Sequence, residues 1–313
     1  MKPKIIVIVG PTASGKTALS IEVAKRIGGE IISADSMQIY KDMDIGTAKV
    51  TKEEMQGINH YLIDFVSPEK RYTVSDFKKD AENAIKEILE KGKVPIIVGG
   101  TGLYVNSLIY GIEYQEMKFD ENYRDELMKI AETEEGLKSL YDKAFKIDPE
   151  ATKKISSNDK KRIVRILEIY NATGKTKTEQ EILSRQKGVE YDYKVYGILM
   201  DREKLYNRIN LRVDKMIEQG LIEEVKALCE KYKDFPTAMQ GLGYKEVVEY
   251  FNGILTKEEM IEKIKQESRR YAKRQMTWFR KNQEICWLDA EKDLQNNIDI
   301  ILEGIEWEKS HKS

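Results

Sequence analysis

Residues 10–17, Gly-Pro-Thr-Ala-Ser-Gly-Lys-Thr, form the motif with the clearest chemistry in the sequence. The motif matches the phosphate loop of ATP-binding proteins, and it lies between an apolar run at 5–9 and an amphipathic stretch at 18–27. A strand, a glycine loop and a helix are the context in which such a motif binds phosphate. Its backbone N–H groups and the helix dipole attract anionic oxygens, Lys16 adds a positive charge, and the Thr17 hydroxyl can hold Mg²⁺. The motif therefore predicts a diphosphate or triphosphate site, with a chance glycine-rich turn as the alternative.

Two further polar side chains follow predicted strands. Asp35 comes directly after a strand predicted at 30–34, and Thr101 follows a strand predicted at 94–98. Ligands of parallel sheets bind outside the carboxyl ends of the strands, so both side chains are expected on the rim that carries the phosphate loop. We also expect the strands at 5–9 and 30–34 to be neighbours. The alternative role for Asp35 is to cap a turn or a helix.

The rim lacks one feature of nucleotide hydrolases. In those enzymes a buried strand ends in an aspartate that helps to hold Mg²⁺. Here Gly99 follows the strand at 94–98, and Asp64 belongs only to a short strand predicted at 61–65. The sequence therefore predicts a loop that holds phosphate groups without the usual apparatus for hydrolysing a nucleotide.

The hydrophobic periodicity predicts an α/β fold, with a parallel sheet core of the P-loop NTPase type flanked by helices and an all-α insertion domain. Apolar residues recur at helical spacing over the middle of the chain, and strand-like character returns at 194–200. We therefore place the core, with its C-terminal helices, at 1–113 and 191–313, and the insertion at 114–190. The charged tail after Trp287 is expected to fray in part.

Two clusters of basic residues suit an RNA backbone. Asp159 and three cations, Lys160, Lys161 and Arg162, open a predicted helix, where positive charge opposes the helix dipole unless phosphates lie nearby. A second helix, predicted at 261–281, carries eight positive and two negative charges with interleaved aromatic residues. On one of its faces lie Arg270, Lys273 and Arg274. The alternatives are a solvated charge run and a basic helix packed on the core.

The composition limits the other classes of function. The formal net charge is −1, so any nucleic-acid site has to be a local patch. The two cysteines are far apart, which fits a reducing cytosol, and the presence of only two histidines argues against a zinc site. The N-terminal apolar run of five residues is too short for a signal peptide or a membrane span. We therefore expect a cytoplasmic protein with no membrane partner.

Several blocks of sequence together resemble the tRNA dimethylallyltransferases (tRNA isopentenyltransferases). The phosphate loop is followed by Ile-Ser-Ala-Asp-Ser-Met-Gln-Ile-Tyr-Lys at 32–41, Asp-Ile-Gly-Thr-Ala-Lys at 44–49 and Val-Gly-Gly-Thr-Gly-Leu-Tyr at 98–104. The later blocks are Asn-Asp-x-x-Arg-x-x-Arg-x-Leu-Glu at 158–168, Gly-Tyr-Lys-Glu at 243–246 and Ala-Lys-Arg-Gln-x-Thr-Trp-Phe-Arg at 272–280. The resemblance covers nearly the whole chain in order. The zinc-finger extension of eukaryotic members is absent, which indicates a bacterial-type member.

The resemblance implies a tRNA-modifying prenyltransferase. Such an enzyme transfers a dimethylallyl group from dimethylallyl diphosphate to N6 of the adenine just 3′ of the anticodon, at position 37, and releases diphosphate. Mg²⁺ is then the expected cofactor, and the tRNA anticodon stem-loop is the expected partner. A monomer suffices for this chemistry.

The resemblance also implies roles for individual residues. Catalysis is assigned to Lys16, Asp35 and Thr101, with Asp35 as the general base for N6. The diphosphate is assigned to Gly10, Pro11, Thr12, Ala13, Ser14, Gly15, Lys16, Thr17 and Arg208, with Arg202 and Arg212 as competitors of Arg208. Thr17 is the expected metal ligand. Contacts with tRNA are assigned to Asp35, Ser36, Met37, Gln38, Thr101, Arg124, Asp159, Lys160, Lys161, Arg162 and Ile163, and the basic helix adds Arg270, Lys273 and Arg274.

Three other classes of protein share some of these features. A small-molecule kinase would use the phosphate loop and Asp35, but it would need neither basic cluster. An isopentenyltransferase that acts on free AMP or ADP would be similar in the core, and it would need neither the insertion nor the basic segments. A non-enzymatic RNA-binding protein would not need Lys16 and Asp35 on one rim.

The first basic cluster leads to a prediction about salt dependence. Replacing both Lys161 and Arg162 by glutamine should lower the slope of log tRNA affinity against log salt concentration by about two, because each lost phosphate contact removes about one released counterion. Titrations of labelled tRNA at several salt concentrations measure this slope. An unchanged slope would place both side chains away from the RNA.

Overall fold

The protein is described here by a computed structural model that covers residues 2–114 and 120–310. The chain divides into two compact units. The sheet unit consists of Met1–Ile109 and Glu190–Ser313, and the helical unit consists of Tyr110–Val189. The insertion predicted at 114–190 falls almost entirely within the helical unit. None of the helices in the described part of the chain combines the length and the hydropathy that a membrane span needs.

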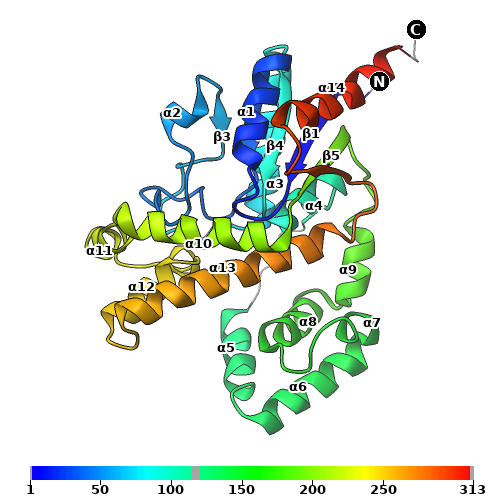
Figure 1. Ribbon diagram of the computed structural model, residues 1–313. Coiled ribbons are helices and arrows are strands. Elements are labelled where there is room, and N and C mark those ends of the chain that lie inside the picture. The colour runs from blue at the N-terminus through cyan, green and yellow to red at the C-terminus, as the bar shows by residue number, and fades with distance from the viewer. Residues whose placement is uncertain (1, 115–119, 311–313) are drawn as a thin grey trace. The chain divides into compact units, whose positions relative to one another are not determined.

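Six parallel strands form the sheet in the described residues, in the order β3-β2-β4-β1-β5-β6. Figure 1 shows the sheet, with β1, β3, β4 and β5 labelled. Their bounds are Lys4–Val9 (β1), Gly29–Ser33 (β2), His60–Tyr61 (β3), Val94–Gly99 (β4), Asp192–Leu199 (β5) and Cys286–Asp289 (β6). The central strands β1 and β4 are near-continuous apolar runs, as expected for strands that are buried on both faces. This sheet, with helices on both sides, confirms the predicted fold class.

The strand order corrects one expectation. β1 and β2 are not neighbours, because β4 lies between them and Ile96 stands opposite both Ile6 and Ile31. The apolar residues of β4 account for this central position, since they can be buried on both faces of the sheet. At the end of β4, Gly99 approaches β2 so closely that a Cβ would lie 2.2 Å from the backbone oxygen of Ala34. The turn after β4 therefore reaches the rim between the ends of β1 and β2.

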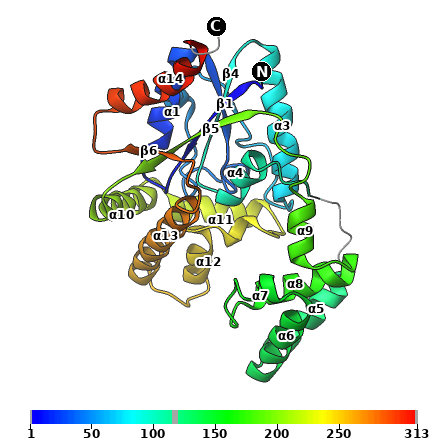
Figure 2. The same cartoon turned by 90° about the vertical axis from the view of Figure 1, so that its right-hand side faces the viewer.

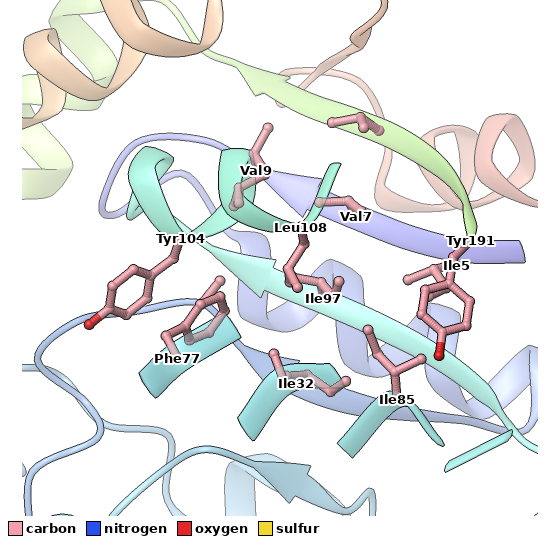
Figure 3. Packing of buried hydrophobic residues seen from close by; sticks show 14 of the residues in the cluster. Ile5, Val7, Val9, Ile32, Phe77, Ile85, Ile97, Tyr104, Leu108 and Tyr191 are labelled. Carbon is pink, nitrogen blue, oxygen red and sulfur yellow. The ribbon is translucent and has the colours of Figure 1, made fainter. Parts of the chain in front are cut away.

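Helices cover both faces of the sheet (Figure 2). They are α3 (Val74–Glu90) and α4 (Gly102–Ile109) on one face, and α1 (Lys16–Ile27) and α14 (Leu294–Ser310) on the other. Figure 3 shows the first face, where the rings of Phe77 and Tyr104 stack with their centroids 4.1 Å apart. The same cluster includes Ile32 and Ile97 from the sheet. These two apolar layers hold the strands, and with them the rim, in place.

A further group of helices follows β5 in the sheet unit. It consists of α10 (Arg202–Glu218), α11 (Leu221–Lys231), the 3-10 helix η1 (Ala238–Gln240), α12 (Tyr244–Phe251) and α13 (Lys257–Phe279), and the short α2 (Lys52–Met55) lies earlier in the chain. α10 and α13 run side by side (Figure 1). α13 is the basic helix predicted at 261–281. It begins earlier than predicted because Thr256 and Glu259 form a capping box, in which each side chain accepts a hydrogen bond from the other's backbone N–H.

Two segments differ from the prediction. The strand predicted at 61–65 is reduced to β3, because Leu62 and Asp64 adopt positive φ angles of 59° and 57°, which end an extended strand. The tail after Trp287 is predicted to fray in part, but its described residues form the last two residues of β6 and then α14. Ile298 and Ile301 of α14 are buried against the sheet, so an apolar stripe among the charged residues anchors the tail.

The helical unit contains five helices in the described residues, and the first four of them build an apolar core of its own. They are α5 (Glu121–Ile130), α6 (Glu134–Ile147), α7 (Pro149–Thr152), α8 (Lys160–Thr173) and α9 (Lys177–Leu183). Asp148 ties two of them together, because it accepts hydrogen bonds from the backbone N–H groups of Ala151 (2.9 Å) and Thr178 (2.8 Å). The unit's first and last segments lie side by side, since the N–H of Glu113 donates to the carbonyl of Ser184 at 2.7 Å.

Candidate active site

A cavity of about 400 Å³ lies at the carboxyl ends of β1, β2 and β4 in the sheet unit. Its polar lining includes Thr12, Lys16, Thr17, Asp35, Ser36, Gln38, Arg212, Lys245, Ser268, Tyr271, Arg274 and Gln275. Its apolar lining includes Met37, Val98, Ile209, Val213, Met216, Leu242 and Ile264. One cavity therefore offers cations, a carboxylate and an apolar wall.

The phosphate loop forms one end of the cavity. Gly15 caps α1 with a φ of 95°, a left-handed conformation that glycine adopts without strain. The side chain of Ser14 is buried, and its Oγ has no hydrogen-bond partner in the described residues. Buried polar atoms are normally paired, so this hydroxyl fits a site that receives an anionic oxygen. Lys16 Nζ donates to the backbone oxygen of Pro11 at 2.7 Å, which keeps the ammonium over the loop.

Two cations face each other in the cavity. Burial and then the positive charge of Arg212 lower the pKa of Lys16 to about 8, and the charge of Asp35 opposes this shift. Burial likewise lowers the pKa of Arg212, again against the effect of Asp35. An anion bound between Lys16 and Arg212 would relieve their repulsion and stabilise both charged forms.

The structure brings Arg212, rather than Arg208, to the phosphate loop. Arg212 Nη1 donates to Thr12 Oγ1 at 3.2 Å, and Arg212 lines the cavity. Arg208 is exposed, and its Nη1 lies 3.8 Å from Met200 Sδ. The two arginines are one turn apart on α10, and the helix passes the cavity with the face that carries Ile209 and Arg212. Between the two competitors, the geometry therefore favours Arg212 over Arg208 as the arginine that binds the diphosphate.

Asp35 caps a turn and also lines the cavity. Its Oδ1 accepts hydrogen bonds from the backbone N–H groups of Met37 (2.9 Å) and Gln38 (3.3 Å). Asp35 therefore has the capping role that the sequence analysis considered as an alternative. Both of these hydrogen bonds are accepted by Oδ1. Oδ2 is left to accept a hydrogen bond or a proton from a ligand. The turn fixes the carboxylate at the end of β2, on the side of the cavity that faces Lys16 and Arg212.

Thr101 supports the segment at 35–38 through hydrogen bonds to Ser36. Its Oγ1 accepts from the backbone N–H of Ser36 at 3.0 Å and donates to Ser36 Oγ at 3.3 Å. Its own backbone N–H donates to the carbonyl of Ala34 at 3.2 Å. The described residues that line the cavity include Ser36 but not Thr101. In this structure Thr101 therefore connects the end of β4 to the turn that carries Asp35.

Gln275 is a site residue that sequence reasoning missed. Its Oε1 accepts from the backbone N–H of Thr12 at 2.9 Å, and its Nε2 donates to the carbonyl of Gly100 at 3.0 Å. The side chain is buried and lies so close to Gly100 that a Cβ there would be 2.1 Å from Nε2. One amide therefore joins α13 to the phosphate loop and to the turn after β4. Its position within the block at 272–280 was the signal that could have identified it.

Glu224 of α11 organises another wall of the cavity, and it was also missed. Its carboxylate accepts hydrogen bonds from the backbone N–H groups of Ile45 (2.7 Å) and Gly46 (3.1 Å), and from Tyr244 Oη (2.7 Å). The ring of Tyr244 lies against Gly46, where a Cβ would be 2.5 Å from Cε2. Nothing in the local sequence pattern connects α11 with the loop at 44–46, because the contact depends on tertiary packing.

The three basic residues predicted on one face of α13 have different surroundings. Arg274 lines the cavity, with its guanidinium 5.6 Å from the centre of the Tyr271 ring. Arg270 pairs with Glu267 at 2.5 Å, and Lys273 is exposed. Of the three, the described lining of the cavity includes only Arg274. Burial raises the pKa of the neighbouring Tyr271 to about 12, with the charge of Asp35 as the next cause, so its hydroxyl stays protonated at neutral pH.

The residues predicted in the helical unit divide into exposed and structural side chains. Asp159 caps α8 by accepting from the backbone N–H of Arg162 at 3.1 Å, and Lys161 and Arg162 are exposed. Ile163 is fully buried in the core of the unit, so its side chain anchors α8, and the contact of this residue with tRNA stays a prediction. Arg124 Nη1 donates to both carboxylate oxygens of the buried Glu168, at 2.9 and 2.8 Å, which gives Arg124 a structural partner.

Comparison with known proteins supports the same chemistry. The sequence profile described as IPP transferase matches residues 38–282. A tRNA dimethylallyltransferase of Caldanaerobacter subterraneus subsp. tengcongensis is 49% identical over 312 residues, which cover 97% of this chain and 99% of that protein. Another, of Carboxydothermus hydrogenoformans, is 52% identical over 298 residues, which cover 95% of this chain and 96% of that protein.

Solved structures show the same similarity. The full-length tRNA isopentenylpyrophosphate transferase of Bacillus halodurans matches with a TM-score of 0.75 and 44% identity, over 99% of this chain and 98% of that chain. A eukaryotic dimethylallyltransferase acting on tRNA matches with a TM-score of 0.79 and 33% identity, over 97% of this chain and 80% of that chain.

The pKa of Lys16 leads to a pH prediction. Diphosphate binds the protonated ammonium, so its affinity should fall as the pH rises through about 8, by about one log unit per pH unit. Calorimetric titration with inorganic diphosphate between pH 7 and 9.5 measures this slope. Lys16→Gln is the control, because ionisation of the ligand affects both proteins equally. Identical pH profiles for the two proteins would contradict the assignment.

The two arginines of α10 allow a matched comparison. Arg212→Gln should weaken diphosphate binding by roughly tenfold or more, the usual effect of losing a charge-assisted hydrogen bond. Arg208→Gln removes the same charge one turn away and should change the affinity by less than about twofold. The same titration at pH 7 measures both variants. A larger loss in Arg208→Gln would restore the original assignment.

Proposed function

The chain belongs to the IPP transferase family, and we propose from this premise how the residues of the cavity carry out its reaction. Its activity is that of a tRNA dimethylallyltransferase, the prenylation of adenine 37 of tRNA. Its substrates are accordingly dimethylallyl diphosphate and tRNA. One observation supports the assignment of this reaction to the cavity: the phosphate loop, two cations and the Asp35 carboxylate line the same space.

Departure of the diphosphate is the first part of the proposed mechanism. The bond between the allylic carbon and oxygen breaks, and its electron pair goes to the diphosphate. Lys16, Arg212, the Ser14 hydroxyl and the backbone N–H groups of the loop stabilise the negative charge that develops there. The allylic carbon tolerates positive character, so this stabilisation lowers a large part of the barrier. The apolar side chains of the cavity hold the five-carbon group.

Attack by the adenine is the second part. The N6 lone pair forms the new bond to carbon, and an exocyclic amine is a weak nucleophile unless its proton is removed. Asp35 accepts a hydrogen bond from N6 and takes this proton as the general base, through the oxygen that the turn leaves available. Thr101 positions Asp35 through Ser36. Asp35 thus receives the proton, N6 receives the prenyl group, and the phosphate loop on the same rim holds the diphosphate.

The residues present fit a magnesium ion. Thr17 lines the cavity, and no cluster of three or more His, Cys, Asp or Glu side chains occurs in the described ranges 2–114 and 120–310. Such a site suits Mg²⁺, which keeps several water ligands and is bound mainly through substrate phosphates. When bound, the ion would neutralise charge on the departing diphosphate. Thr17 is the protein ligand we propose.

Several groups are proposed to hold the tRNA. The target adenine has to be splayed out of the stacked anticodon loop to reach the cavity. Residues 35–38 and Arg274 would contact it there, and the exposed cations Lys161 and Arg162 of the helical unit would contact the phosphate backbone. We propose that the protein acts as a monomer in the cytoplasm, where its tRNA substrate is found.

A transfer assay tests the function. Labelled dimethylallyl diphosphate and Mg²⁺ are offered with tRNA and with AMP in parallel, and the labelled nucleoside is located in the tRNA. Label at the adenine beside the anticodon, and in tRNA alone, is the expected result. Label in AMP would make this a free-nucleotide enzyme and would leave the helical unit with a structural role. ATP consumption without labelling of either acceptor would indicate a kinase.

The general base leads to a prediction with a conservative substitution. Asp35→Asn keeps the oxygen that accepts from Met37 and Gln38, so the turn should survive while the proton acceptor is lost. We expect kcat to fall by at least about 10²-fold, with tRNA affinity changed by only a few-fold. Single-turnover transfer kinetics and a binding titration measure the two effects. Turnover close to that of the unaltered protein would remove Asp35 from the mechanism.

A further inference from the structure

We propose that Trp278 and Leu103 form a stacking platform for a base that flanks the target adenine in the anticodon loop. The inference rests on the proposed function, in which that adenine enters the cavity of the sheet unit. Both side chains are large, apolar and exposed, at 38% for Trp278 and 47% for Leu103. We call this pair the Trp278 platform.

The position of the indole is fixed by a close backbone contact. The pyrrole edge of Trp278 lies against Gly102 at the start of α4, where a Cβ would be 2.2 Å from Cδ1 and 2.4 Å from Nε1. Any side chain at Gly102 would push the ring away. The contact holds the ring against the residue that precedes Leu103 in the chain, while more than a third of the tryptophan surface stays open. A ring held in this way loses little conformational entropy when a flat ligand stacks on it.

The platform adjoins the cavity through two elements. On α13, Tyr271, Arg274 and Trp278 are spaced three and four residues apart and therefore share one face, and the first two line the cavity. On α4, Gly102 follows Thr101, which is hydrogen-bonded to the cavity residue Ser36. The platform therefore lies about one helical turn from the cavity lining, which is within reach of a nucleotide next to a splayed-out adenine.

The chemistry of the surroundings favours RNA as the occupant. When one base leaves a stacked loop, its neighbours lose a stacking partner, and an aromatic side chain can replace it. Two cations precede Trp278 on the same helix. Lys273 is exposed, and Arg274 lies one turn before Trp278. A purely apolar protein partner would not need these cations. The flat ring with adjacent cations is the combination that binds single-stranded nucleic acid.

Two substitutions and two controls separate stacking from charge and from packing. Trp278→Leu keeps an apolar side chain but removes the flat face, and it should raise the Kd for an anticodon stem-loop roughly fivefold or more. Trp278→Phe should recover most of the affinity. The slope of log Kd against log salt should stay unchanged in both, whereas Lys273→Gln should lower it by about one if Lys273 contacts a phosphate. Leu211→Ala, which truncates an exposed apolar side chain on α10, should have no effect.

Kinetics and fluorescence complete the test. Trp278→Leu should raise KM for tRNA and leave both KM for dimethylallyl diphosphate and the melting temperature unchanged. A stem-loop with 2-aminopurine on either side of the target adenine should show quenched fluorescence on binding the unaltered protein and not on binding Trp278→Leu. Equal stem-loop affinity and equal quenching in the two proteins would overturn the proposal. Absence of tRNA binding by the unaltered protein would instead contradict the proposed function.

Discussion

The repulsion between two half-buried cations, Lys16 and Arg212, is the constraint around which the site is built. In the free protein this repulsion adds to burial in lowering the pKa of Lys16, and the charge of Asp35 opposes the effect. Their positions are held by neutral partners, the carbonyl of Pro11 and the hydroxyl of Thr12. A diphosphate placed between them replaces repulsion by two attractions. The protein therefore folds with an unfavourable charge arrangement that its substrate makes favourable.

The remaining parts of the site are joined by neutral hydrogen bonds. Gln275 connects the phosphate loop to the turn after β4, and Thr101 connects that turn to the segment that carries Asp35. Because amide and hydroxyl groups carry no net charge, these links fix the geometry without competing for the anion. The central position of β4 is what makes them possible, since it brings one turn within reach of both neighbouring strands.

Sequence patterns predicted those parts of the fold that depend on local chemistry. The phosphate loop, the buried strands and the basic helix all have short-range signatures, and the position of Asp35 directly after a predicted strand placed it on the rim. The strand order, the choice of Arg212 over Arg208, and the roles of Gln275 and Glu224 depend on packing between distant segments, which no local pattern encodes. Ile163 shows that a residue inside a block shared with the family can have its side chain buried in the core of its own unit. The tail is predicted to fray in part because it is rich in charged residues, and the few apolar residues that anchor α14 on the sheet lie among them.

The adjacent ends of the helical unit bear on how such a protein can arise. The N–H of Glu113 bonds to the carbonyl of Ser184, and Gly111 lies so close to Gly188 that a Cβ would be 2.3 Å from its carbonyl oxygen. A segment that leaves and rejoins a chain at neighbouring points, with an apolar core of its own, can be acquired or lost in one genetic step without breaking the host sheet. The catalytic unit and the helical unit can therefore have separate evolutionary histories, and the helical unit is a natural module for transplantation between enzymes.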